Sequence, residues 1–219
     1  FEAPDPPFTF VEVPDVAARG AALVDLDRDG LLDLVADGGR AGVPFRVRVT
    51  FNGDGRRGPL PDQDLIAGAD FLPEVVDARL ADVDGDGWLD VVTVDTDGAI
   101  DAYRQVAGAD APPDVFVGPA FEEAVRLAPP CGCVRFVEVL DLNGDAAVDL
   151  LAWRRDAASL TVWDRDPAAP LGEAFTPRVL PLGSAPGDVV LHDMDRDGRP
   201  DLLLRSGGEV FLRLQDGPR

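Results

Sequence analysis

An aspartate-rich pattern of nine residues occurs four times in this chain and constrains its fold more than any other feature. The pattern reads Asp-x-Asp/Asn-x-Asp-Gly/Ala-x-x-Asp, and its copies begin at positions 25, 82, 141 and 193. Successive copies therefore start 57, 59 and 52 residues apart. A pattern that recurs at a nearly constant period indicates one structural unit per repeat.

The spacing within each copy favours a site for a hard divalent cation. Side chains at positions 1, 3 and 5 converge in a tight turn, and glycine at position 6 permits a positive φ. The carbonyl of position 7 then points inward, and Asp at position 9 completes an all-oxygen shell that suits Ca²⁺ better than Mg²⁺. We expect about one Ca²⁺ per repeat, held by Asp25, Asp27, Asp29, Leu31, Asp33; Asp82, Asp84, Asp86, Trp88, Asp90; Asp141, Asn143, Asp145, Ala147, Asp149; and Asp193, Asp195, Asp197, Arg199, Asp201.

The third copy departs from the pattern at two positions. Asn143 supplies a neutral oxygen where the other copies have Asp, and Ala146 stands where they have Gly. A residue with a Cβ at positive φ costs roughly 1–2 kcal/mol. We therefore expect the third site to be the weakest, or its loop to distort.

An EF-hand opens with a similar pattern but needs an acidic residue at position 12 and a helix on each side. Position 12 is Ala36, Thr93, Ala152 or Leu204 in the four copies, so none has the acid. The segments that follow the loops are short and apolar, which is typical of buried strands. These segments are 32–35, 91–94, 148–151 and 202–204.

Each repeat continues with further strand-like segments. A third strand is expected at 45–51, 100–103, 160–163 and 210–214, and a fourth at 64–66, 124–127 and 178–182. Four antiparallel strands that recur in this way describe the blade of a β-propeller. The sequence therefore predicts an all-β fold, a β-propeller of four four-stranded antiparallel blades.

The fourth repeat has no segment for an outer strand, whereas a spare one, 8–13, precedes the first loop. We expect this N-terminal strand to close the last blade. The prediction is one domain over 1–219, with repeats at about 14–67, 68–127, 128–183, and 184–219 plus 8–13. The alternatives are that the chain forms part of a larger ring or pairs with a second copy.

The charge of the chain is concentrated in the pattern. The net charge is −21, 33 of the 41 acidic residues are Asp, and 15 of these Asp residues belong to the four copies. Clustered carboxylates attract cations and repel nucleic acid and anionic membranes, although adaptation to high salt also produces acidic surfaces. No apolar run reaches the roughly 18 residues of a membrane span. We expect neither nucleic-acid binding nor membrane insertion.

The chain resembles the FG-GAP/VCBS repeat family, which includes the calcium-binding blades of integrin α-subunit propellers. The resemblance lies in the aspartates named above, while the Phe-Gly and Gly-Ala-Pro landmarks of that family are absent. It implies a loop between the first two strands of each blade, and a role in adhesion or recognition outside the cytoplasm.

Three functions are compatible with this sequence. The first is a calcium-binding extracellular, periplasmic or cell-surface module without catalysis, which binds a protein or glycan or has a structural role, with self-association possible. The second is a carbohydrate-binding propeller, in which an exposed ring such as Trp88 stacks on sugars, while Trp153 and Trp163 are expected in the core. The third, a propeller hydrolase or lyase, is disfavoured because the single histidine, His192, leaves no nucleophile set.

Overall fold

The computed structural model describes residues 18–26, 28, 30, 32–38, 46–50, 63–64, 75–106, 120–122, 124–132 and 134–213. These residues form 17 β-strands and one 3-10 turn, η1 (Leu171–Glu173), without any α-helix. The all-β prediction is confirmed. None of the described residues belongs to a helix that is long and apolar enough to cross a membrane.

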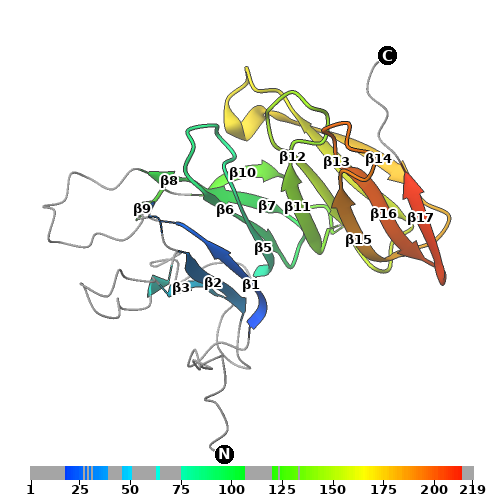
Figure 1. The fold of residues 1–219 in the computed structure, drawn as a ribbon, viewed down its shortest axis with the longest axis horizontal. Coiled ribbons are helices and arrows are strands. Elements are labelled where there is room, and N and C mark those ends of the chain that lie inside the picture. The colour runs from blue at the N-terminus through cyan, green and yellow to red at the C-terminus, as the bar shows by residue number, and fades with distance from the viewer. Residues whose placement is uncertain are drawn as a thin grey trace, which may run out of the picture.

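Four antiparallel meanders follow one another along the described parts of the chain (Figure 1). The first sheet consists of β1 (Ala18–Val24), β2 (Asp33–Gly38), β3 (Arg46–Thr50) and β4 (Gln63–Asp64). The second consists of β5 (Val75–Ala81), β6 (Asp90–Asp95), β7 (Ile100–Tyr103) and β10 (Val125–Ala128). The third consists of β11 (Phe136–Leu140), β12 (Asp149–Trp153), β13 (Ser159–Arg165) and β14 (Phe175–Pro181). The fourth consists of β15 (Pro186–His192), β16 (Asp201–Ser206) and β17 (Glu209–Arg213).

The predicted strands of the repeats are found in place. Each aspartate-rich segment joins the first strand of a sheet to the second. The loops are therefore flanked by strands and not by the helices of an EF-hand, as predicted. The outer strand is present in the first three sheets and absent from the described residues of the fourth. The expected closing strand, 8–13, lies outside the described residues. None of the sheets closes on itself, and the closed four-bladed ring stays a prediction.

A short hairpin was not predicted. β8 (Gln105–Val106) pairs with β9 (Ala120–Phe121) and lies between β7 and β10 in the chain. The other sheets have no equivalent hairpin among the residues that are described, so the repeating pattern of the sequence could not predict it.

The second strand of each middle sheet is buried on both faces. In β6, Val91 packs with Leu26 and Val35 of the first sheet, whereas Val92 and Val94 pack toward the third sheet. Because successive side chains of a strand point to opposite faces, one strand serves two interfaces. The long apolar runs after each loop follow from this two-sided burial.

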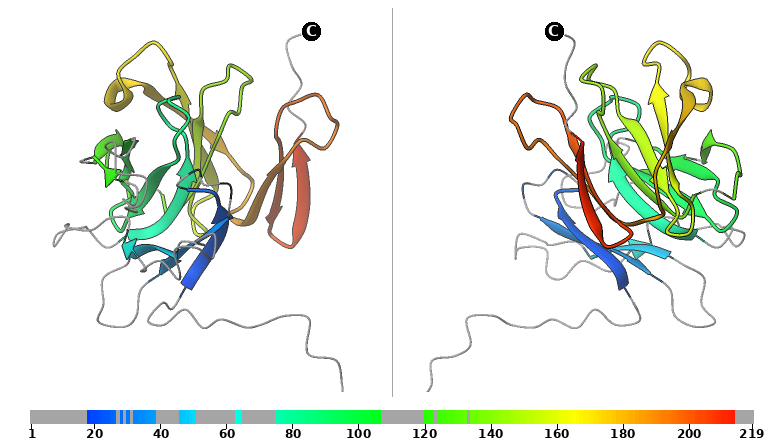
Figure 2. Two further views of the ribbon diagram at one scale, coloured as in Figure 1. Left: turned by 60° about the vertical axis from the view of Figure 1, so that its left-hand side comes forward. Right: turned by 90° about the vertical axis from the view of Figure 1, so that its right-hand side faces the viewer.

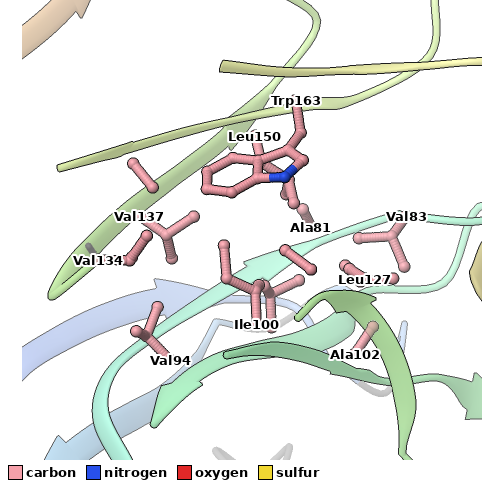
Figure 3. Packing of buried hydrophobic residues seen from close by; sticks show 13 residues of the cluster. Ala81, Val83, Val94, Ile100, Ala102, Leu127, Val134, Val137, Leu150 and Trp163 are labelled. Carbon is pink, nitrogen blue, oxygen red and sulfur yellow. The ribbon is translucent and has the colours of Figure 1, made fainter. Parts of the chain in front are cut away.

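The interface between the second and third sheets is the largest apolar cluster of the described residues. Figure 3 shows Leu150 and Trp163 of the third sheet lying over Ile100 of the second. The neighbouring residue Leu151 points the other way, toward Leu204 of the fourth sheet. Figure 2 shows the resulting order, with the fourth sheet, orange to red, beside the third.

The expected burial of two tryptophans is confirmed, and one cysteine forms a disulfide. Trp153 and Trp163 are buried in the core, as expected, and the ring of Trp153 stacks on Phe136 at 5.5 Å between centroids. Cys131 is disulfide-bonded, and the only other cysteine of the chain is Cys133.

Candidate metal centre

The four aspartate-rich segments, 25–33, 82–90, 141–149 and 193–201, are called the first to fourth loop. In each loop the first aspartate accepts a hydrogen bond from the backbone N–H of position 6. The N···O distances are 3.0 Å from Gly30 to Asp25, 2.8 Å from Gly87 to Asp82, 2.9 Å from Ala146 to Asp141 and 3.0 Å from Gly198 to Asp193. This bond folds the loop back around its first carboxylate.

The ninth aspartate is a buried anchor in every loop, with at most 1% of its surface exposed. One oxygen accepts the N–H of position 2: Leu26 to Asp33 (2.9 Å), Val83 to Asp90 (2.8 Å), Leu142 to Asp149 (3.0 Å) and Met194 to Asp201 (2.8 Å). The second oxygen of Asp90 accepts the N–H of Gln105, and that of Asp149 accepts the N–H of Arg165, each at 2.8 Å. In the second and third loops the ninth position therefore ties its loop to the end of the third strand, at Gln105 just after β7 and at Arg165, the last residue of β13.

The middle positions are oriented by local turns. In the second loop, Asp84 accepts the N–H of Asp86 at 3.2 Å, and Asp86 accepts the N–H of Trp88 at 2.8 Å. The same two bonds recur in the third and fourth loops, to Asn143 and Asp145 and to Asp195 and Asp197. These turns hold the side chains of positions 3 and 5 in fixed orientations.

Carboxylate oxygens converge in two loops. Oxygens from Asp82, Asp84 and Asp90 lie within 4.8 Å of one another, as do oxygens from Asp193, Asp195 and Asp197. In the first loop, Oδ1 of Asp25 is buried without a hydrogen-bond partner. Each of these oxygens keeps a lone pair for a cation, so the residues present fit an all-oxygen Ca²⁺ site.

The carboxylates of each loop lie close together, and burial and mutual repulsion shift the pKa values of some of them. Burial, reinforced by the charges of Asp84 and Asp86, raises the pKa of Asp90 to about 6. Burial likewise raises the pKa of Asp149. At Asp141 partial burial acts in the same direction, but hydrogen bonds from backbone N–H groups, including that of Ala146, outweigh it and lower the pKa. A bound divalent cation would remove the repulsion that opposes charge in these loops.

The backbone is left-handed at two positions of each loop. Position 6 has φ between 69° and 88° in all four loops, as its glycines predict, and Ala146 adopts 69° despite its Cβ. The third loop keeps the hydrogen bonds of the others, so it accepts this strain without changing shape. Position 4 also has positive φ, at Arg28, Gly85, Gly144 and Arg196, which was not predicted because arginine gives no signal for this conformation.

Arginines add contacts around the second loop that spacing alone does not reveal. The guanidinium of Arg28, from the first loop, lies over the ring of Trp88 at 3.8 Å from its centroid. Arg104 forms an ion pair with Asp84 at 3.3 Å. The first contact joins two neighbouring loops, and the second places a cation beside a predicted ligand.

For the remaining predicted ligands, the structure gives only part of the geometry of the site. Asp27, Asp29 and Leu31 lie outside the described residues. At position 7, Trp88, Ala147 and Arg199 each donate their N–H to the residue at position 5. Their carbonyl oxygens stay predicted ligands, as does the order of affinity among the loops.

Comparison with known proteins gives one result for this region. Residues 141–204 match a family model described as an FG-GAP-like repeat. The match starts at the first aspartate of the third loop and ends in β16, so it contains the third and fourth loops entire. No curated protein matches the chain.

Proposed function

Because residues 141–204 form an FG-GAP-like repeat, we propose that the chain is a calcium-stabilised module of the β-propeller type. It acts outside the cytoplasm, where it binds a protein or glycan or gives shape to a larger surface protein, and it catalyses no reaction. The observation that carries this proposal is the convergence of carboxylates in the second and fourth loops within 4.8 Å.

The loops would serve as structural braces. Calcium, when bound, supplies positive charge to a ring of carboxylates. The protein supplies the rest: Asp90 fixes the loop to the chain after β7, and Asp82 holds the turn around position 6. Since all these acids are engaged in holding the loop, they are poorly placed to act as a catalytic acid and base.

Carbohydrate binding is a second candidate function. It has less support at Trp88, the ring that was expected to stack on a sugar. One face of Trp88 is covered by Arg28, so that face is closed to a sugar. Enzymatic hydrolysis or lyase chemistry has no further support in the described residues. Neither nucleic acid nor a lipid bilayer suits a chain with a net charge of −21.

We infer that the ring closes between the first and fourth sheets. Each of these sheets has an apolar outer face: Leu23 in the first, and Val190 with Leu212 in the fourth. Leu203 pairs with both Val190 and Leu212, so these three side chains share one face. Contact between the two sheets would bury these exposed apolar side chains.

A double-mutant cycle tests this closure. Leu23→Asp and Leu212→Asp each place a charge in the proposed interface, and their effects on unfolding should be coupled rather than additive. The pair Leu23→Asp and Val179→Asp is the control, because Val179 lies exposed on the third sheet. Additive effects in both pairs would contradict closure and favour self-association or a larger ring.

The proposed calcium binding is tested by native mass spectrometry of the metal-free chain during titration with Ca²⁺. We expect about one ion per loop, with the third loop filled last, and much weaker retention of Mg²⁺. The variant Asp195→Ala, which removes the oxygen ligand at position 3 altogether, should lose one ion. A chain that retains no Ca²⁺ at millimolar concentration, or that prefers Mg²⁺, would contradict the proposal.

A further inference from the structure

A cavity of about 390 Å³ lies between the third and fourth sheets. Its size is within the range of sites for small molecules, about 300–1,000 Å³. Its apolar lining comes from both sheets and from the third loop, through Leu142, Leu151, Val162, Leu180, Leu191 and Leu202. The cavity is therefore a gap in the packing of two sheets, bordered by Asn143 of the third loop and Pro200 of the fourth.

The burial of the lining residues shows which way the cavity opens. Leu151 and Val162 are buried and form its floor, whereas Arg178 and Arg213 are exposed and stand at its mouth. The walls are thus apolar at depth and cationic at the rim. This gradient suits a ligand with an apolar tail and an anionic head.

The charge at the mouth runs against that of the chain as a whole. Arg178 is paired with Asp164 at 3.1 Å. Arg213 makes no hydrogen bond or ion pair with the residues that the structure describes. Two arginines and one aspartate give the rim a net positive charge, although the chain carries −21.

We propose that this cavity binds a small carboxylate with an apolar tail, a medium-chain fatty acid in chemical class. The tail would lie against Leu151 and Val162, and the carboxylate would accept hydrogen bonds from Arg213. A guanidinium matches the two oxygens of a carboxylate. The nearby carboxylate of Asp164 disfavours a doubly charged head such as a phosphate monoester. Because Leu142 and Asn143 line the cavity, the site needs the third loop to be folded.

The test is titration calorimetry with octanoate on the full chain in calcium-containing buffer. We expect saturable binding with one site per chain, and no comparable binding of octylamine or butyrate. Arg213→Gln should weaken octanoate binding at least about tenfold, as the loss of a charge-assisted hydrogen bond predicts. The control is Arg205→Gln, because Arg205 is exposed on the neighbouring strand and pairs with Asp188 instead.

A second pair of variants tests the apolar part of the cavity. Leu180→Trp adds volume at the lining and should abolish binding, whereas Val179→Trp, one residue away on the opposite face of β14, should not. Melting temperatures of all variants check that the fold is kept. Equal binding of octanoate by Arg213→Gln and Arg205→Gln, tight binding of octylamine, or no heat of binding with octanoate in the folded protein would overturn the proposal.

Discussion

Gln105 donates a hydrogen bond from its side-chain amide to the backbone carbonyl of Leu26 at 3.1 Å, across 79 residues of sequence. The backbone N–H of Gln105 is bound at the same time to Asp90. Leu26 belongs to the first loop, where its own N–H is bound to Asp33. The ninth aspartates of two neighbouring loops are thus joined through one buried glutamine.

Gln105→Met keeps the size of this side chain and removes its amide. We expect the protein to lose about 1–2 kcal/mol of unfolding free energy, because the carbonyl of Leu26 is left without a donor. Calcium binding at the first and second loops should also become less coupled. Urea unfolding and calcium titration measure the two effects. If the variant kept the unfolding free energy and the calcium coupling of the wild type, the hydrogen bond from Gln105 to Leu26 would contribute to neither.

Substitutions at position 6 should have opposite effects in two loops. Ala146→Gly is expected to stabilise the protein by about 1 kcal/mol, because it relieves the positive φ of 69°. Gly198→Ala should destabilise it by about the same amount, and nothing lies within 4 Å of the added Cβ to confuse the result. Chemical denaturation at fixed calcium concentration measures both. A destabilising Ala146→Gly would contradict the assignment of strain to this residue.

How far the sequence predicts this structure depends on whether a feature is local. The spacing of aspartates predicts the loops and the glycine conformations because both arise within nine residues. The apolar runs after each loop, such as 91–94, predict β6 and its equivalents because strands buried on both faces have no alternation.

Features that depend on distant segments were not predictable in this way. The link from Gln105 to Leu26 joins two repeats, and glutamine at that position carries no motif. The left-handed conformation at Arg28 and Arg196 is imposed by the closed turn, against the preference of the residue. The cavity between the third and fourth sheets depends on how two sheets pack, which no single repeat encodes.

The fifth and ninth positions of a loop should differ in what they contribute. Asp90→Asn removes one acceptor from a buried side chain that receives two N–H groups, which should cost about 1–3 kcal/mol even in chelator. Asp86→Asn should be nearly neutral in chelator, because its exposed oxygen still accepts the N–H of Trp88. Both variants should bind one Ca²⁺ fewer. Equal stability of the two in chelator would contradict an anchoring role for Asp90.

The contact between the second and third sheets contains a buried polar bridge. Asp77 accepts the N–H of Val137 at 2.9 Å and pairs with Arg79, which also binds Glu138. Asp77→Ala should destabilise the protein by about 1–3 kcal/mol, because a buried N–H loses its acceptor. Asp188→Ala, which breaks an exposed ion pair with Arg205, should cost less than about 1 kcal/mol. Similar losses in thermal or urea unfolding would show that the bridge adds nothing.

The central claim is that a cation in the aspartate loops holds the sheets of this chain in their folded arrangement. The most direct measurement is the melting temperature of the full chain at millimolar Ca²⁺ and after removal of metal with a chelator. The account predicts a large fall, well over about 10 °C, because protein that binds ligand only when folded is stabilised by mass action. It also predicts recovery when Ca²⁺ is restored. An unchanged melting temperature in chelator would contradict it.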